Sequence, residues 1–477
     1  MISVSASSVS VRASTATPAR SWGEAGQLSL LRYWRNPERT LHRLSARQGE
    51  LALFRLGRQR VAYLSGAELI ERVLIGEGKS VDKTGLISRW WRERVPLYHY
   101  GASVDTHDRE QHRAVRRALN PPLSLDRAEA DVPLMATTVA RLCQEQYERG
   151  GQFDLLAFAG MLTSACFLRS LCEREPDLAE LERLVGLRLK ATSRALPIRA
   201  PSSPLYDLWD ILRDLVSHPR RIPDDIRAQL LELVEDLFPA AASSLQAHME
   251  RATAFTPPRL ATTDEAVERL LGLIAGDLQA SGVLLYCSLL GVQARELGDA
   301  LAAEVPVGAL DGPRLHRLEL AKGAVMEGAR LTAPFLLIRV CHQPFAVDGL
   351  PIEPGDLLFA SPYLLHRDPG LWPEPECFRP ERWHGEEAAA RPRRAFLTFG
   401  GGIRQCGGRR HVLTAATTAL ATLERHWRLD LDGELSDVAF KPPPRSIEPS
   451  PDRRLQARLV PRHSSSRAPE TLEERPR

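Results

Sequence analysis

A run of ten residues near the carboxyl end, FGGGIRQCGG starting at Phe399, constrains the fold more than any other part of the chain. It places Cys406 in a glycine-rich turn, with Arg404 two residues before it. A thiolate is stabilised by electropositive surroundings and by backbone N–H groups, and such a turn supplies both. Glycines such as Gly400 and Gly408 carry no Cβ, so the backbone can approach a flat cofactor closely. The run therefore predicts a cysteine that binds the iron of a haem, with Arg404 placed to pair with a carboxylate on the cofactor's edge.

The residues that follow, RRHVLTAATTALATLERHW, have apolar side chains at helical spacing. A helix that begins here would direct its positive amino-terminal end at the sulfur. A buried structural cysteine and an ordinary glycine turn are the simpler interpretations, and neither accounts for the complete pattern. A zinc site is disfavoured, because no two cysteines of the chain have C-x-x-C spacing.

Length and composition set the class of protein. A chain of 477 residues exceeds the usual single-core limit, and its 43% hydrophobic content can build a core that encloses a haem. A formal net charge of +3 argues against nucleic-acid binding driven by global charge. The seven cysteines are an odd number without a framework pattern, which indicates a reducing, cytoplasmic environment.

Three segments are predicted along the chain. Residues 1–22 are rich in Ser, Ala and Thr and lack the apolar stretch of a secretory signal or a membrane anchor. A transit peptide has a similar composition, but a disordered bacterial-type amino terminus is preferred. Residues 23–463 are expected to form a single catalytic domain, and the polar residues 464–477 a disordered tail. The apolar stretch 270–292 is long enough to span a membrane, but Asp277 near its middle favours a buried central helix.

The pattern of apolar residues predicts a mainly helical chain with small β-sheets. A hairpin is expected from the runs LALFRLG and RVAYLSG, which flank the Gly57-Arg58 step and precede a helix, AELIERVLI. Helices are expected over most of 105–216, near 264–300 and from about 312 to 331. Short strands separated by DG and PGD turns are expected between 334 and 365.

Two charged motifs accompany the cysteine. Glu327 and Arg330 stand three apart, so their side chains lie on one face of a helix and can pair with each other and with a third group. Arg382, in the run FRPERW, is a candidate for that third group. Taken alone, E-x-x-R is common and most often a surface pair.

Taken together, the cysteine run, E-x-x-R, FRPERW, LHRDP at 365–369 and HRAVR at 112–116 resemble the cytochrome P450 family over roughly residues 28–461. The resemblance implies the cytochrome P450 fold, mainly α with small β-sheets, and haem b as cofactor. It implies that Cys406 is the axial ligand of the iron and that Glu327, Arg330 and Arg382 form a structural triad that locks the loop before the cysteine. It also implies that His112, Arg116 and Arg339, together with Arg404, contact the haem propionates, while Phe399, Gly400 and Gly408 shape the haem loop.

The central helix departs from the family's pattern. The family places a small residue and a glycine, then one variable position, then an acid and a threonine over the haem. Here the order is Ala275, Gly276, Asp277, Leu278 and Gln279. The acid–alcohol pair that delivers protons to bound dioxygen is thus replaced, and Gln279 and Asp277 are the candidates for that catalytic role.

The resemblance implies a monooxygenase that uses dioxygen and electrons from a redox partner. The expected substrate is a small lipophilic molecule of secondary metabolism, such as a terpenoid or polyketide, lying against Ala275, Gly276, Gln279, Phe335 and Leu336. Five arginines near the cysteine, at 391, 393, 394, 409 and 410, predict a basic face that steers an acidic ferredoxin or flavodoxin, itself served by a reductase. The expected protein is a cytoplasmic monomer without a membrane span and without a nucleic-acid partner.

Three other functions stay open at this point. The missing acid–threonine pair leaves room for a peroxide-dependent or redox-neutral haem-thiolate enzyme, which would not need a reductase. A non-catalytic haem sensor is a second possibility, but no attached signalling domain is evident in this sequence to support it. A helical protein whose cysteine loop is coincidental would bind no haem.

Overall fold

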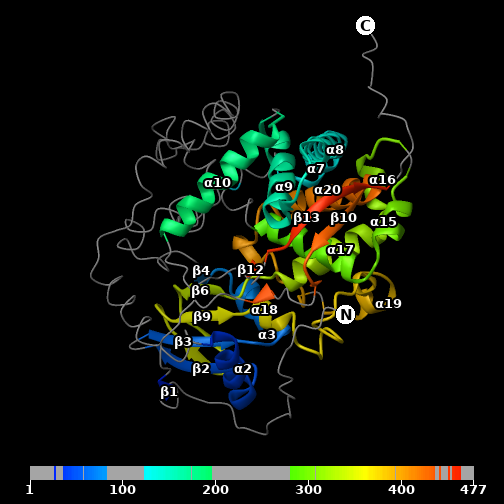
Figure 1. Cartoon of the computed structure of the whole chain (residues 1–477). Coiled ribbons are helices and arrows are strands. Elements are labelled where there is room, and N and C mark those ends of the chain that lie inside the picture. Colours follow the sequence, from blue (N-terminus) through cyan, green and yellow to red (C-terminus); the bar gives the residue numbers. More distant parts are fainter. Residues whose placement is uncertain are drawn as a thin grey trace.

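The structure is a computed structural model that places a helical region beside a β-rich region (Figure 1). It describes residues 26–27, 36–56, 59–82, 116, 123–172, 175–195, 280–306, 308–392, 394–435, 440–441, 450–451 and 454–462. The predicted terminal segments, 1–22 and 464–477, lie outside these residues. The expectation of a mainly helical chain with small sheets is confirmed.

Several helices begin where the sequence supplies a capping side chain or a proline in the first turn. The Asn36 side chain accepts a hydrogen bond from the Arg39 N–H at the start of α2, and Ser124 and Asp311 do the same at α7 and α16. The helices are α2 (Pro37–Gln48), α3 (Ala67–Glu71), α7 (Leu125–Ala130), α8 (Val132–Arg149), α9 (Leu155–Cys172), α10 (Leu178–Ala195), α15 (Gly298–Glu304), α16 (Gly312–His316), α17 (Glu319–Leu331), α18 (Pro362–Leu365), α19 (Gly385–Ala390) and α20 (Arg409–His426).

Shorter helical turns are η1 (Arg72–Gly76), η2 (Pro380–Trp383) and η3 (Gly402–Arg404). The expected single helix from about 312 to 331 is two helices, α16 and α17. Residue 318 between them has a non-helical ψ of 79°, which separates α16 from α17.

A central helix, described from residue 280 to 294, supports the buried interpretation of the 270–292 stretch. Residues 281–292 are all buried, as a helix that is apolar all round requires. Ser281, on this helix, donates a 2.9 Å hydrogen bond to the Thr163 hydroxyl on α9. Among the described residues, no helix is long and apolar enough to cross a membrane.

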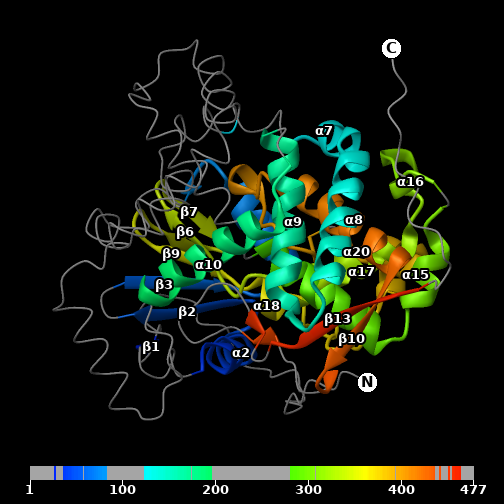
Figure 2. The ribbon, with the colours of Figure 1, turned by 45° about the horizontal axis from the view of Figure 1, so that its top comes forward.

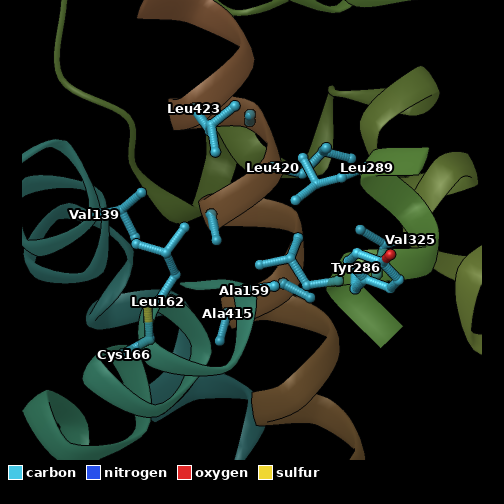
Figure 3. Packing of buried hydrophobic residues seen from close by; sticks show 14 of the residues in the cluster. Val139, Ala159, Leu162, Cys166, Tyr286, Leu289, Val325, Ala415, Leu420 and Leu423 are labelled. Atoms are coloured by element: carbon cyan, nitrogen blue, oxygen red, sulfur yellow. The ribbon is translucent and has the colours of Figure 1, made fainter. Parts of the chain in front are cut away.

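The main core lies between α8, α9, the central helix, α17 and α20 (Figure 2). Figure 3 shows Val139 of α8, Leu162 of α9, Leu289 of the central helix and Leu420 of α20 converging on one another. Buried residues of α20 pack in this core, and the contacts hold in place the helix that follows the cysteine.

The β-rich region is built on a six-stranded sheet of order β1-β2-β3-β9-β6-β4. The predicted hairpin forms its second and third strands, β2 and β3, with Leu56 opposite Gln59 at the turn. Strand β3 then pairs in parallel with β9, and β9 pairs antiparallel with β6. The strands are β1 (Gly26–Gln27), β2 (Leu51–Leu56), β3 (Gln59–Leu64), β4 (Val81–Asp82), β6 (Leu337–Cys341) and β9 (Leu357–Ala360).

Smaller sheets complete the fold. The DG turn predicted in the 334–365 stretch joins β7 to β8, with positive φ angles of 51° at Asp348 and 81° at Gly349 that suit a two-residue hairpin loop. The remaining strands are β5 (Phe153–Asp154), β7 (Phe345–Val347), β8 (Leu350–Ile352), β10 (Trp427–Asp432), β11 (Phe440–Lys441), β12 (Ser450–Pro451) and β13 (Gln456–Pro461).

Candidate haem-thiolate site

Cys406 lies in a tight loop between η3 and α20. Its backbone N–H donates a 2.9 Å hydrogen bond to the Phe399 carbonyl, which closes the loop, and its side chain is exposed. Gly402 has a φ of 69°, and a Cβ there would meet the Leu74 carbonyl oxygen at 2.9 Å. The glycine is therefore required both by the backbone conformation and by the close approach of η1.

The helix α20 begins three residues after the cysteine, at Arg409, as the sequence predicts. The Arg409 guanidinium lies 5.9 Å from the centre of the Phe399 ring. Burial lowers the pKa of Arg409, the neighbouring Arg394 and Arg410 lower it further, and the charge of Cys406 opposes that change. Cys406 thus has a helix amino terminus and a cationic side chain as neighbours, both of which favour a thiolate.

Two of the predicted propionate contacts are placed near this loop or the sheet beside it. Arg116 lies against the residue after the cysteine, because a Cβ on Gly407 would clash with Nη1 of Arg116. Arg339 lies on β6 with 3% of its surface exposed, and its Nη1 donates a 2.9 Å hydrogen bond to the Ile338 carbonyl.

Arg404 has a partner that the sequence did not reveal. Its Nε and Nη2 donate to Oδ1 and Oδ2 of Asp82 at 2.6 and 2.8 Å, and both side chains are buried. A protein carboxylate on β4 thus holds one edge of the guanidinium, and the predicted contact of Arg404 with a haem propionate stays a prediction. No local pattern around Asp82 marks it, because the two residues are far apart in the sequence.

Glu327, Arg330 and Arg382 meet in one buried network, and all three are 0% exposed. The Glu327 carboxylate accepts from Arg330 at 2.7 and 2.9 Å and from Arg382 at 2.9 Å. It also accepts from the Trp383 Nε1–H at 2.9 Å and from the Arg379 backbone N–H at 3.0 Å. Burial alone would raise the pKa of Glu327, but these donors together lower it, so the carboxyl is ionised at neutral pH.

The network reaches the cysteine loop through intermediates that sequence reasoning missed. His366 is fully buried, and its Nε2 accepts from the Leu397 N–H at 2.9 Å. The proton therefore sits on Nδ1, which donates to the Arg330 carbonyl at 3.0 Å. The Thr398 hydroxyl donates to the Ala329 carbonyl at 2.7 Å. The sequence did contain His366, in the LHRDP motif, but nothing in it specified this contact.

A chain of aromatic ring contacts links the same buried network to the cysteine loop. The Trp383 ring, whose N–H bonds to the network, lies 5.0 Å from Phe396, and Phe396 lies 6.1 Å from Phe399. Phe396 also stacks on His366 at 5.4 Å. The loop that presents Cys406 is consequently held by packing as well as by hydrogen bonds.

Two predicted substrate contacts lie in a hydrophobic cluster of the β-rich region. Phe335 and Leu336 are 3% and 8% exposed and belong to a hydrophobic cluster with Tyr63 and Tyr363. This cluster lies between the sheet, α2 and α18, and the predicted contact of both residues with the substrate stays a prediction. The other predicted residues over the haem, and one predicted propionate contact, lie outside the described residues: Ala275, Gly276, Asp277, Gln279 and His112.

One of the five arginines expected on a partner surface is buried instead. Arg391 has a side chain that is 7% exposed, and its guanidinium lies 4.1 Å from the Trp372 ring centre. Its Nη2 donates to the Arg382 carbonyl at 2.9 Å. Arg393 is outside the described residues, Arg394 pairs with Glu71, and Arg410 is exposed.

The donor set fits a haem. It contains the exposed thiol of Cys406, and no cluster of His, Cys, Asp or Glu that could hold another metal ion occurs among the described residues. Three guanidinium groups belong to this part of the fold: Arg404 lies in the loop, Arg116 packs against Gly407 of the loop, and Arg339 lies on β6. A single thiolate ligand with nearby arginines is what an iron porphyrin with two carboxylates requires.

Comparison with known proteins gives the same answer. The family model described as Cytochrome P450 matches residues 17–227 and 311–450, well over half of the chain. Cyclooctat-9-en-7-ol 5-monooxygenase of Streptomyces melanosporofaciens is 28% identical over 437 residues, 87% of this chain and 92% of that protein. Cyclooctatin synthase of the same organism is 27% identical over 83% of this chain and 86% of its own length, and salviol synthase of Salvia pomifera is 24% identical over 83% and 82%. A glycine-rich cysteine loop braced by a buried Glu–Arg–Arg network, in a chain that matches this family along most of its length, identifies a member of the cytochrome P450 family and hence a haem-dependent monooxygenase.

Proposed function

We propose that this enzyme hydroxylates or otherwise oxidises a lipophilic small molecule of secondary metabolism, with a terpenoid as the first candidate and a polyketide as the second. The cofactor is haem b with Cys406 as the axial ligand of its iron. The observation that carries the proposal is the loop that presents the exposed Cys406 thiol at the start of α20. When bound, the haem supplies the redox chemistry that activates dioxygen.

The residues of the chain provide binding and orientation. Phe399, Gly400 and Gly408 shape the loop against the cofactor, and Arg116, Arg339 and Arg404 offer cations to its propionates, joined by His112. Glu327, Arg330 and Arg382 hold that loop in place from behind. Support for these roles comes from the charge balance, since two propionates removed from water need cationic partners.

The terpenoid assignment rests on the relatives. One of them is a 5-monooxygenase of the alkenol cyclooctat-9-en-7-ol, and the relatives include terpenoid-modifying enzymes. We place the substrate against Ala275, Gly276 and Gln279, together with the apolar side chains of Phe335 and Leu336 that follow α17 in the chain.

Electrons come from a ferredoxin or flavodoxin and its reductase. Arg394, Arg409 and Arg410 lie on the side of the loop where α20 begins, and a basic surface there attracts an acidic carrier. The enzyme works as a monomer in the cytoplasm, and the seven cysteines without a framework pattern support the reducing compartment.

Proton delivery falls to Gln279, which would hold a water molecule, or to a hydroxyl of the substrate, with Asp277 as the nearest acid in the sequence. Replacement of the acid–threonine pair by Leu278 and Gln279 also favours a second candidate, a peroxide-dependent or redox-neutral enzyme. The family model leaves residues 228–310 unmatched, and this stretch contains both positions.

The test begins with visible spectra of the purified protein supplemented with haem. The native chain is expected to show a Soret band, and its ferrous–CO complex the red-shifted band of a thiolate ligand. Cys406→Ser should lose the red-shifted band. A native protein that binds no haem, or a Cys406→Ser protein with an unchanged CO spectrum, would reject the proposal.

A second step identifies substrate and oxidant. Terpenoids, macrolides, steroids and fatty acids are titrated into the ferric protein, and a shift to the high-spin Soret position identifies the class that displaces water from the iron. Product formation is then compared between dioxygen with ferredoxin and reductase, hydrogen peroxide alone, and substrate alone. Turnover that needs only peroxide, or no co-reactant, would replace the first candidate by the second.

A further inference from the structure

The buried pair between Asp82 and Arg404 is the strongest interaction near Cys406 that the roles above leave unused. Both edges of the contact are hydrogen-bonded, Nε to Oδ1 at 2.6 Å and Nη2 to Oδ2 at 2.8 Å. The side chains are 1% and 2% exposed. A two-point contact between an arginine and a carboxylate fixes the guanidinium plane as well as its position.

The pair connects two elements that position the cofactor. Arg404 ends the turn η3, two residues before Cys406. Asp82 lies on β4, opposite Val340 and therefore next in register to Arg339 on β6. The carboxylate thus ties the cysteine loop to the edge of the six-stranded sheet from which another cation arises.

Charge provides the second step. Arg116, Arg339 and Arg404 contribute three positive charges near the loop, while a haem brings two propionates. Asp82 supplies a third carboxylate, so these three arginines face three carboxylates once the cofactor is bound. Without the Asp82 carboxylate, Arg404 would add net positive charge beside the iron. Screening of that charge by water is weak because the pair is buried.

We propose that Asp82 is a positioning residue for the haem: it orients the Arg404 guanidinium for the propionate and, through its own negative charge, holds the reduction potential of the iron lower. This inference rests on the proposed binding of haem by Cys406. The ferrous iron carries one positive charge fewer than the ferric iron, so a nearby carboxylate favours the ferric form.

Asp82→Asn tests the proposal, because asparagine keeps the size and one acceptor oxygen but removes the charge. The haem-loaded variant is expected to have a higher midpoint potential in a spectroscopic redox titration. The ratio of ferrous to ferric protein at one fixed solution potential should rise several-fold. A tenfold rise would correspond to about 59 mV for this one-electron couple.

The rate of haem transfer to apomyoglobin tests the positioning role. Asp82→Asn should release haem several-fold faster than the native protein, because Arg404 loses its fixed orientation. In an Arg404→Gln background the same substitution should add little, since it acts through Arg404. If Asp82 had a merely structural role, Asp82→Asn would accelerate haem release by the same factor in the native and the Arg404→Gln background.

Two matched controls separate charge and stability from position. Asp348→Asn removes an exposed carboxylate that pairs with Arg72, and it should leave both readouts unchanged. Asp356→Asn disrupts another largely buried Asp–Arg contact of the same sheet, with Arg60, and should lower thermal stability with a smaller effect on the potential.

The proposal is overturned by an Asp82→Asn protein whose potential is unchanged or lower, or by equal acceleration of haem loss in both Arg404 backgrounds. Failure of the native chain to bind haem would instead reject the proposed function, so the two failures are distinguishable.

Discussion

At the residue scale, two equally buried histidines differ in whether their ring nitrogens have hydrogen-bond partners. Burial lowers the pKa of His366 to about 3 and that of His411 to about 4. His366 uses both ring nitrogens in hydrogen bonds that tie α17 to the cysteine loop. His411, on α20, is equally buried beside Phe167, but neither of its ring nitrogens has a hydrogen-bond partner in the described structure. The hydrogen bonds of His366 stabilise the cysteine loop, whereas the burial of His411 without hydrogen bonds destabilises the folded protein.

His411→Leu is therefore expected to stabilise the protein. Removal of an unsatisfied buried polar ring should raise the free energy of unfolding by about 1–2 kcal/mol at neutral pH. The gain should grow as the pH falls from 6.5 to 4, because only the unfolded state binds a proton on this histidine in that window. At pH 5 the extra gain is about 2 kcal/mol. Urea unfolding at pH 7.5 and pH 5 measures both quantities.

His342→Gln, at an exposed histidine, is the control and should stay within about 0.5 kcal/mol of the native protein at both pH values. A His411→Leu protein that is less stable than the native one at both pH values would mean that the imidazole makes a favourable contact that leucine lacks.

At the scale of elements, the carboxylate on α17 compensates two buried arginines and holds η2 against the helix. Glu327→Gln should cost about 3–5 kcal/mol, since it leaves two buried guanidinium groups with a neutral partner. Because η2 and α17 support the cysteine loop, the haem Soret band should be lost at the same lowered urea concentration as the helical signal in circular dichroism.

Glu387→Gln is the matched control, because Glu387 contacts Arg382 and Arg391 from the edge of the same network with a side chain that is 34% exposed. Its cost should stay below about 1 kcal/mol. Equal costs for the two substitutions would show that the buried carboxylate has no special role.

The crossing of α9 and the central helix depends on two glycines. A Cβ at Gly282 would meet the Cα of Gly160 at 2.7 Å, and the Ser281–Thr163 hydrogen bond lies beside this contact. Gly282→Ala should force the helices apart and cost about 1–3 kcal/mol. Gly186→Ala on α10, where nothing lies within 4 Å of the added Cβ, should instead stabilise by about 0.5–1 kcal/mol. Thermal unfolding of both variants measures the difference, and equal shifts would contradict the packing argument.

The sequence predicted those parts of the fold and site that local patterns encode. The hairpin before residue 65, the start of α20 and the partners in the E-x-x-R network all follow from spacing, turn residues and motifs. Asp82 could not be predicted, because its partner Arg404 is distant in the chain and its own neighbours carry no signal. The prediction that Arg391 lies on an exposed basic face was wrong. A run of arginines is typical of a surface, but the rings of Trp372 and Trp383 cover the Arg391 guanidinium.

At the scale of the whole molecule, the buried position of Arg391 narrows the face that can attract a redox partner. Arg410→Glu should raise the KM for a reduced ferredoxin about three- to tenfold, and the effect should shrink at high salt because exposed charges are screened. Turnover with peroxide, where the substrate supports it, should not change. Steady-state kinetics at two ionic strengths provide the measurement.

Arg391→Lys is the contrasting variant. It should lower stability, because lysine cannot reproduce the stacking on Trp372 and the bond to the Arg382 carbonyl, while the KM for ferredoxin stays the same. A raised KM in this variant and none in Arg410→Glu would place the docking surface elsewhere.

The parallel pairing of β3 with β9 has a consequence for biosynthesis. Val61 emerges from the ribosome long before its neighbour Leu357, so the early hairpin must wait with an unpaired inner edge while most of the nascent chain is made. Closure over so long a loop is slow, and an exposed edge meanwhile invites association with other chains. Cys406 and the helix behind it are translated later still. The enzyme is thus expected to acquire its cofactor only at the end of synthesis, with the early hairpin as the segment that most needs protection by chaperones.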